Sequence, residues 1–344
     1  MNHADHPKSS QSQVSSLGKT ALQAEDIHQA ARRLEGVAHR TPVFSSHSLN
    51  RLARAQVVLK TENLQRTGSF KFRGAYNAVT SLGADASAKG VCAFSSGNHA
   101  QAIALASTLA GAHATILMPE DAPIVKRQAT EGYGARVITF DRYRDDRSAL
   151  AAELADREGL TLVHAFDNVQ VMAGQGTVAL ELIADTDPID VLVVPVSGGG
   201  LIAGCATIAR ELHPTIQIVG VEPESGDDTA RSFAAGHRVH IPVPRTIADG
   251  LQAETPGAIT YPIVRQLVSS IVTVSDSQIA QAMQILFERL KVVVEPSGAA
   301  GLAAVLSHPD KFTDRRVGVI LTGGNISADS FSRTIAAVAS TDEQ

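Results

Sequence analysis

Cysteine is scarce in this sequence: Cys92 and Cys205 are the only two in 344 residues, and each stands in an apolar stretch. More than a hundred positions separate them, so the pattern indicates neither a disulfide framework nor a zinc site. We therefore predict two reduced core thiols in a cytoplasmic protein.

Long apolar runs and blocks of positive charge are absent as well. The most apolar stretch, residues 102–118, is interrupted by Ser107, Gly111 and His113, whereas a membrane helix needs about 20 apolar residues. The chain has 30 basic and 35 acidic residues, a net charge of −5, and no basic cluster. These absences predict no membrane span and argue against nucleic acid or anionic membranes as partners. A small molecule is the expected partner.

The N-terminus lacks an apolar signal segment, because residues 1–19 are polar and rich in serine. We expect residues 1–22 to form a disordered leader. A helical pattern follows, with Ile27 and Leu34 on one face and a stop at Gly36. The ordered fold should begin with this helix.

What the sequence does contain is a regular alternation of helix-like and strand-like segments, which is typical of an α/β protein with a parallel sheet. Its length fits one large or two medium domains. No low-complexity linker interrupts the chain, so any second domain must be inserted between strands of the first. Eight short apolar runs are predicted strands: residues 57–60, 91–94, 114–118, 135–140, 191–196, 216–222, 271–274 and 317–322.

Unusual loops follow three of these strands: SSGNHA begins at Ser95, SGGGLIAG at Ser197 and GGN at Gly323. Ligands of parallel α/β sheets bind at the carboxyl ends of strands, so these loops are candidates for a binding site. By itself, SSGNHA is more typical of an ordinary helix N-cap turn, and His99 within it of a structural histidine.

The three glycines after Ser197 favour a phosphate site, because consecutive backbone N–H groups and a helix N-terminus bind anions. The alternative is a tight strand-to-helix turn, which needs only one glycine. The loop lacks GxGxxG and the chain lacks GxxxxGK[ST], which disfavours a dinucleotide and an ATP P-loop. A single phosphate on a compact cofactor fits better.

Lys71 lies between Phe70 and Phe72 in the stretch TGSFKFRGA. Burial beside these rings would favour the neutral amine, a nucleophile that forms a Schiff base with a carbonyl. The alternative is a lysine that extends from a helix start into solvent. Together with a single-phosphate site, a reactive amine indicates pyridoxal phosphate.

Seven motifs occur here in the order found in serine/threonine dehydratases and serine racemases: ENLQRTGSFKFRGA, SSGNHAQA, PVSGGGLIAG, GVEP, TIADGL, ERLKVVVEPSGAAGLAAV and LTGGN. The chain resembles this family of fold type II pyridoxal-phosphate enzymes, which are similar to the tryptophan synthase β subunit. The resemblance implies an α/β fold with a doubly wound large domain, residues 23–88 and 165–337. It also implies an inserted small mobile domain, residues 89–164, a tail at 338–344, and a homodimer.

Carried over to matching positions, the resemblance makes Lys71 the Schiff-base lysine and the catalytic base, with Phe70 beside the cofactor ring. Thr322 would place its hydroxyl at the pyridine nitrogen. The residues expected to hold the phosphate are Ser197, Gly198, Gly199, Gly200 and Leu201. The residues expected to bind the substrate carboxylate are Ser95, Ser96, Gly97, Asn98 and His99, and Asn98 would also bond the ring's 3-oxygen.

A neutral hydroxyl at the pyridine nitrogen makes the ring a weaker electron sink than a carboxylate would. The expected enzyme is therefore a dehydratase, or ammonia-lyase: a β-hydroxy amino acid such as L-threonine, L-serine or 3-hydroxyaspartate loses water and ammonia to give a 2-oxo acid. Ser96 matches the acid/base of the racemases, so a serine or aspartate racemase, or a bifunctional enzyme, is the alternative. A non-catalytic binding protein is a remote third.

Within VEPESGDD, the resemblance implies a Mg²⁺ or Ca²⁺ site formed by Glu222, the carbonyl of Gly226 and Asp228. A solvated acidic turn is the alternative interpretation. The chain ends at Gln344, which leaves no room for the C-terminal regulatory domain of biosynthetic threonine deaminases, so feedback by isoleucine is not expected.

Two further features bear on the substrate. Glu254 and Thr255 stand where the racemases carry small hydroxyl residues, which indicates a specialised or larger substrate. Three arginines in DRYRDDRS could bind a second carboxylate, although a solvated helix face is the more ordinary explanation: Arg142, Arg144 and Arg147. We assign Arg73 and Gly74 to structural pairing and helix packing.

Overall fold

The computed structural model describes residues 20–122, 124–141 and 143–339. Most of the predicted leader, residues 1–22, and of the predicted tail, residues 338–344, lies outside these ranges. Leu22, at the end of the predicted leader, is buried. Within the described ranges, no helix combines the length and the apolar character needed to cross a bilayer.

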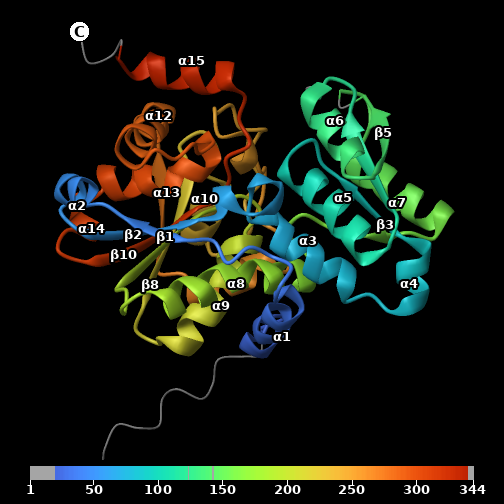
Figure 1. Cartoon of the computed structure of the whole chain (residues 1–344), viewed down its shortest axis with the longest axis horizontal. Coiled ribbons are helices and arrows are strands. Elements are labelled where there is room, and N and C mark those ends of the chain that lie inside the picture. The colour runs from blue at the N-terminus through green and yellow to red at the C-terminus, as the bar shows by residue number, and fades with distance from the viewer. Residues whose placement is uncertain (1–19, 123, 142, 340–344) are drawn as a thin grey trace, which may run out of the picture.

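A six-stranded sheet forms the core of the larger lobe (Figure 1). Its strand order is β1-β2-β10-β7-β8-β9, and every pairing is parallel except that of β1 with β2. The last strand of the described chain, β10, therefore lies in the middle of the sheet. The strands are β1 Val43–Ser45, β2 Gln56–Thr61, β7 Val191–Pro195, β8 Gln217–Pro223, β9 Ser270–Val274 and β10 Arg316–Leu321.

Helices cover both faces of this sheet because its strands are apolar on both sides. Val191 and Val193 pack with α2, α12, α13, α14 and α15, whereas Leu192 and Val194 pack with α1, α8, α9 and α11. The helices of this lobe are α1 Ala24–Leu34, α2 His47–Ala53, α8 Val169–Asp185, α9 Gly200–Leu212, α10 Asp228–Ala235, α11 Thr260–Leu267, α12 Asp276–Ile285, α13 Pro296–Ser307, α14 Pro309–Phe312 and α15 Ala328–Ala339.

A second, four-stranded parallel sheet has the order β5-β4-β3-β6 (Figure 1). Its strands lie between β2 and β7 in the chain, so they interrupt the strands of the larger sheet in sequence. Its strands are β3 Val91–Phe94, β4 Ala114–Pro119, β5 Arg136–Phe140 and β6 Thr161–Leu162. The associated helices are α3 Lys71–Thr80, α4 Ala84–Lys89, α5 Asn98–Ala110, α6 Ile124–Gly132 and α7 Arg147–Glu158.

All eight predicted strands are confirmed, and the first helix ends at Leu34, followed by Gly36 with a φ of 71°. The strands β1 and β6 were not predicted, because with three and two residues respectively they contain too few residues to show a strand pattern. Short 3₁₀ turns follow β2 and precede α11: η1 Glu62–Leu64, η2 Arg66–Gly68 and η3 Asp249–Leu251. A π-helical turn, η4 Leu286–Leu290, ends α12.

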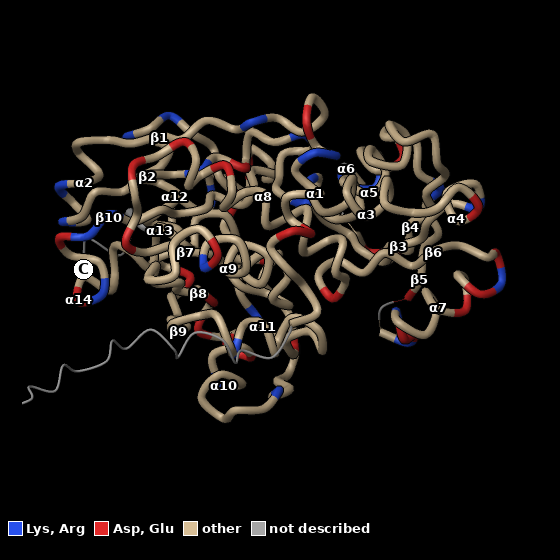
Figure 2. The backbone as a smooth tube through the Cα atoms, turned by 90° about the horizontal axis from the view of Figure 1, so that it is seen from below, with Lys and Arg blue, Asp and Glu red and all other residues tan. Residues whose placement is uncertain are grey.

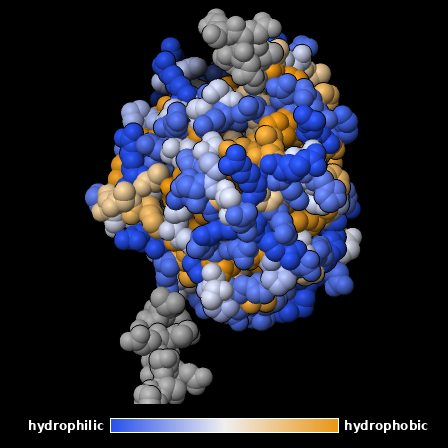
Figure 3. All heavy atoms as spheres, turned by 90° about the vertical axis from the view of Figure 1, so that its left-hand side faces the viewer, coloured by the Kyte–Doolittle hydropathy of each residue, from blue (hydrophilic) through white to orange (hydrophobic). Residues whose placement is uncertain are grey.

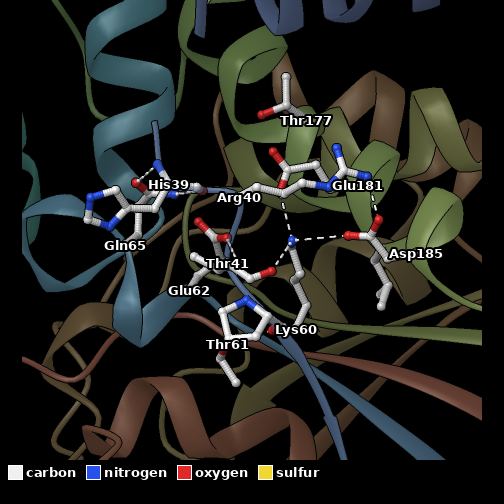
Figure 4. A network of polar contacts seen from close by, with 12 residues as sticks. His39, Arg40, Thr41, Lys60, Thr61, Glu62, Gln65, Thr177, Glu181 and Asp185 are labelled. Carbon is white, nitrogen blue, oxygen red and sulfur yellow. Dashed lines mark hydrogen bonds and ion pairs between the residues drawn. The ribbon is translucent and has the colours of Figure 1, made fainter. Parts of the chain in front are cut away.

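A buried network of charges fixes α3 to the larger lobe. The guanidinium of Arg73 is fully buried and donates to Glu62 (Nε to Oε2, 2.8 Å) and to Glu181 (Nη1 to Oε1, 2.7 Å). Lys60, equally buried, donates to Glu181 Oε2 at 2.6 Å and to the Thr41 carbonyl at 2.7 Å (Figure 4). The prediction that Arg73 serves structural pairing is confirmed.

Close helix packing explains the next residue. Gly74 lies where α3 meets α8, and a Cβ there would stand 2.8 Å from the Val171 carbonyl oxygen. Gly174 on α8 is equally constrained, because its Cβ would stand 2.4 Å from the Arg73 carbonyl oxygen. The two backbones touch, so the assignment of Gly74 to helix packing is also confirmed.

The surface carries both signs of charge. Figure 2 shows acidic and basic residues interspersed along the tube, without a large basic patch in that view of the described chain. On the face shown in Figure 3, hydrophilic side chains surround small apolar patches.

Candidate active site

A cavity of about 410 Å³ opens between the two sheets. Two of the loops singled out in the sequence line it, through Ser95 after β3 and Ser197 after β7, and Thr322 lines it after β10, directly before the GGN loop. Strand ends therefore define the site, as expected for parallel sheets. All the residues predicted to bind cofactor or substrate line this cavity: Phe70, Lys71, Ser95, Ser96, Gly97, Asn98, His99, Ser197, Gly198, Gly199, Gly200, Leu201 and Thr322.

The amine of Lys71 faces this cavity from the first residue of α3. Its Nζ donates to the Ala165 carbonyl at 3.1 Å and lies 5.0 Å from the centroid of the Phe70 ring. Burial lowers the pKa of Lys71 to about 8, and the charge of Glu295 opposes this shift only in part. A substantial fraction of the amine is therefore neutral near physiological pH.

The turn before α3 fixes the position of this amine. Thr67 and Gly68 both adopt left-handed backbone, with φ of 56° and 72°. Asn325 Nδ2 donates to the Thr67 carbonyl at 2.6 Å, and a Cβ on Gly68 would stand 2.3 Å from Asn325 Oδ1. The Phe70 N–H donates to the Thr322 carbonyl at 3.0 Å. The start of α3 is thus held against the loop that follows β10.

The glycine loop before α9 presents free donors. Gly198 and Gly199 are buried, and in the described chain the N–H groups of Ser197, Gly198 and Gly199 donate to no protein acceptor. Gly199 has a φ of 91°, and a Cβ on Gly198 would stand 2.3 Å from the Phe166 ring. Buried N–H groups without acceptors are costly, so the loop at this helix N-terminus is suited to bind an anion.

Asn98 belongs to a hydrogen-bonded chain across the cavity. Its Nδ2 donates to Glu295 Oε1 at 2.7 Å, and its Oδ1 accepts from Asn325 Nδ2 at 2.8 Å. One N–H of Asn98 therefore stays available for a ligand. Burial, reinforced by the charge of Asp249, raises the pKa of Glu295 to about 8.

Glu295 was not predicted as a site residue. It lies within the motif ERLKVVVEPSGAAGLAAV, as an acidic residue directly after VVV and before a proline, but the motif by itself predicts no role for it. The folded chain buries this carboxyl at the cavity wall, 5% exposed.

The loop after β3 combines a turn with a fixed histidine. The Gly97 N–H donates to Ser95 Oγ at 3.1 Å. His99 contacts the Val163 carbonyl through Nε2 at 3.0 Å, and burial, with a contribution from Lys71, lowers the pKa of His99 to about 3. The Nε2 contact fixes the ring, and the lowered pKa favours its neutral form.

The cavity contains further residues that the sequence did not single out. Lys126 on α6 reaches Asp249 of the larger lobe, with Nζ 2.9 Å from Oδ2. Phe166, Gln252 and Ser297 also line the cavity. These side chains come from separate segments without a shared motif, so only the fold brings them together.

The predicted metal ligands lie outside the cavity lining. Glu222 and Asp228 are fully buried, so the interpretation as a solvated acidic turn is wrong for these two residues. Glu222 accepts from the N–H groups of Thr229 and Ala230, whereas neither oxygen of Asp228 has a hydrogen-bond partner in the described chain. Burial raises the pKa of both carboxyls, that of Asp228 to about 7. Among the described residues, no group of three or more His, Cys, Asp or Glu side chains is placed to hold a metal.

Four residues flagged for the substrate do not line the cavity. Arg144 is 85% exposed and pairs with Asp141, which fits a solvated role. Arg147 lies over the Phe94 ring and 3.7 Å from Glu254. The structure thus pairs Glu254 with an arginine instead of exposing it to a ligand, and Thr255 also lies outside the lining. Arg142 lies outside the described residues.

The chain is similar to known proteins over most of its length. Residues 34–323 match the family of pyridoxal-phosphate dependent enzymes. The L-threo-3-hydroxyaspartate ammonia-lyase of Pseudomonas sp is 49% identical over 89% of this chain and 96% of its own length. The enzyme of the same name from Saccharomyces cerevisiae is 47% identical over 90% and 95%. The structure of maize serine racemase superposes with a TM-score of 0.87 at 38% identity, covering 94% of this chain and 100% of that one.

The fold and the cavity are those of an α/β enzyme, with backbone N–H groups that lack acceptors beside an amine of lowered pKa. The chain belongs to the pyridoxal-phosphate dependent enzymes, of fold type II. The residues present fit that cofactor: the free N–H groups of the glycine loop suit its phosphate, and Lys71 supplies an amine of lowered pKa. The remaining N–H of Asn98 suits an oxygen of the ring.

Proposed function

We propose that the protein is an ammonia-lyase that removes water and ammonia from L-threo-3-hydroxyaspartate. The observation that carries the proposal is the position of Lys71, whose amine shares one cavity with an anion-binding loop and the N-terminus of α5. The names of two relatives, 49% and 47% identical, support this substrate. L-Threonine and L-serine belong to the same class of β-hydroxy amino acid.

In this proposal the glycine loop, residues 197–201, holds the cofactor's phosphate. Phe70 packs beside the ring, Asn98 donates to the ring's 3-oxygen, and the hydroxyl of Thr322 faces the pyridine nitrogen. When bound, pyridoxal phosphate supplies an aldehyde for the amines of Lys71 and substrate and withdraws electrons from the substrate's Cα. The loop at residues 95–99 binds the substrate's α-carboxylate at the start of α5.

Lys71 then acts as the base. Its neutral Nζ takes the proton from Cα, and the β-hydroxyl leaves with a proton as water. The released enamine takes up a water molecule and loses ammonia, so the balance is one hydroxyaspartate converted to one oxaloacetate and one ammonia. The lowered pKa keeps Nζ available for this proton at neutral pH.

A screen of L-threo-3-hydroxyaspartate, L-threonine and L-serine for ammonia and 2-oxo acid tests the proposal. We expect equal amounts of both products and the highest kcat/KM with hydroxyaspartate. Borohydride reduction followed by peptide mapping should locate the cofactor on Lys71. Absence of ammonia release from all three amino acids would overturn the proposal.

Racemisation is the second candidate, because Ser96 lines the same cavity as Lys71 and can offer a second proton carrier. Chirally resolved product analysis separates the two reactions. D-Serine or D-aspartate formed without a matching 2-oxo acid would favour the racemase.

We also propose that a divalent cation binds Glu222, Asp228 and the Gly226 carbonyl. Two buried carboxyls, one without any partner in the described chain, need either protons or a cation. Added Mg²⁺ or Ca²⁺ should raise the melting temperature of the protein, and Asp228→Asn should abolish this effect. An unchanged melting temperature at millimolar cation would contradict the site.

The assembly and the domain organisation are further proposals. We propose a cytoplasmic homodimer, supported by the family and by two free, buried thiols, Cys92 and Cys205. Residues 89–164 would form the small mobile domain, and residues 23–88 with 165–337 the large one. Light scattering tests the dimer, and small-angle scattering with and without substrate tests the motion.

A further inference from the structure

We propose that Lys126 binds the side-chain carboxylate of a dicarboxylic substrate and so sets the preference for hydroxyaspartate over serine and threonine. The inference rests on the proposed function and names the residue responsible for its specificity. No motif flagged Lys126, and the arginines considered for this role do not line the cavity.

The position of Lys126 suits this role. Its side chain is 29% exposed, and it projects from α6 of the smaller lobe to the cavity wall. Nζ lies 2.9 Å from Asp249 Oδ2, and both side chains act electrostatically on the buried Glu295. The ammonium is therefore on the Glu295 side of the cavity, where it can reach a bound anion.

The charges of the cavity leave Lys126 as the cation for a second carboxylate. Among the described residues that line the cavity, the basic side chains besides His99 are Lys71 and Lys126. His99 is neutral, and the amine of Lys71 is reserved for the reaction. The carboxylate of Asp249 would repel a dicarboxylate unless a cation offset it, whereas the raised pKa of Glu295 keeps that carboxyl mostly protonated at neutral pH.

The neutral side chains on the same side make bonds of their own but carry no charge. Gln252 Nε2 donates to the Thr246 carbonyl at 3.3 Å, and Ser297 Oγ accepts from the Gly250 N–H at 2.9 Å and keeps its own O–H to donate. The anion sites at the starts of α5 and α9 are assigned to the α-carboxylate and the cofactor's phosphate. Lys126 is therefore the charged partner for a second substrate carboxylate. To bind it, Lys126 would give up its half-exposed ion pair with Asp249.

The test compares Lys126→Gln with Arg127→Gln in the holoenzyme. Arg127 is the next residue on α6, pairs with Glu131 in the same helix and does not line the cavity. Arg127→Gln therefore removes the same charge from the same helix without changing the cavity wall. The measured quantity is the ratio of kcat/KM for L-threo-3-hydroxyaspartate to that for L-serine. We expect Lys126→Gln to lower this ratio about 10- to 100-fold, the effect of one charge-assisted hydrogen bond. Arg127→Gln should leave the ratio unchanged. Lys126→Arg should keep part of the preference for hydroxyaspartate.

A binding measurement provides a second readout. Calorimetric titration with L-malate, which has both carboxylates but no amine to react, should show a matching loss of affinity in Lys126→Gln only. Equal losses for hydroxyaspartate and serine would overturn the inference, since they would show that Lys126 merely joins the lobes through Asp249. An unchanged ratio would overturn it as well. If the wild-type protein itself shows no preference for hydroxyaspartate, the proposed function fails first.

Discussion

Lys71 and Arg73 lie two residues apart on α3, and the protein treats their charges in opposite ways. Arg73 is fully buried between Glu62 and Glu181. Burial alone would lower the pKa of Arg73, but the charge of Glu62 and hydrogen bonds to both carboxylates raise it above its ordinary range. In the described chain Lys71 pairs directly with no carboxylate, and burial lowers its pKa to about 8.

The difference separates a structural cation from a chemical one. A buried cation with anionic partners keeps its charge, and breaking the pair leaves an uncompensated carboxylate. A buried amine without such partners releases its proton and becomes a nucleophile or a base. One helix turn thus anchors the fold on one side and supplies the reactive group on the other.

The largest expected effect comes from removing the chemical cation. Lys71→Ala should lower ammonia release by about 10⁴-fold or more, because nucleophile and base are lost together. The melting temperature should change little, since the side chain has no ion pair in the described chain to lose. Steady-state assays and thermal unfolding check both statements. Activity within tenfold of wild type would remove Lys71 from the mechanism.

Removing the structural cation should do the reverse. Arg73→Met leaves the fully buried Glu62 without its partner and should cost about 3–5 kcal/mol of unfolding free energy. Urea denaturation measures the loss. Combining Arg73→Met with Glu62→Gln should recover part of it, because the second change removes the stranded charge. Equal destabilisation by the single and double variants would contradict the ion-pair explanation.

Glu295→Gln tests the carboxyl that faces Lys71. The folded protein raises the pKa of Glu295 from 4.5 to about 8, so it holds this proton more tightly than the unfolded chain does. The associated stability is full below about pH 4.5 and is lost as the pH rises toward 8, on the order of 5 kcal/mol at about 1.4 kcal/mol per pKa unit. Glu295→Gln should flatten the decline of unfolding free energy over this window. A profile that matches wild type would exclude the raised pKa.

The smallest effect concerns the titration of Lys71 itself. With a pKa of about 8, the neutral fraction of the amine rises about tenfold between pH 7 and pH 9. The rate at which apoenzyme takes up pyridoxal phosphate covalently should rise by the same factor. Stopped-flow absorbance measures this rate. A pH-independent rate would place the pKa of Lys71 outside this interval.

Local patterns predicted the strands and the glycine-rich loops of the cavity, whereas the family resemblance supplied the roles of Phe70, Asn98 and Thr322. Apolar runs identified β2 and β10, and glycine-rich turns at strand ends identified Ser95 and Ser197 as neighbours in space. Lys126 and Glu295 could not be found in this way. The residues around them predict no role in the cavity, and each matters only because the fold places it beside partners distant in the chain.

The two buried carboxyls near the end of β8 also show that the sequence alone does not determine burial. Glu222 and Asp228 read equally well as a solvated turn, because a short acidic stretch carries no information about burial. Their burial follows from the end of β8 and the start of α10, which are packed by other elements. The pattern of residues names candidates, and tertiary packing decides their environment.

The position of β10 between β2 and β7 also determines when during synthesis the large sheet and its cavity can be completed. Synthesis from the ribosome delivers β10 after every other strand of the described chain, so the large sheet has an open gap until residues 316–321 emerge. Thr322 and Asn325, which hold the start of α3, arrive with it. Contacts of such long sequence separation form slowly. A nascent chain should therefore carry a folded smaller sheet before it can bind its cofactor.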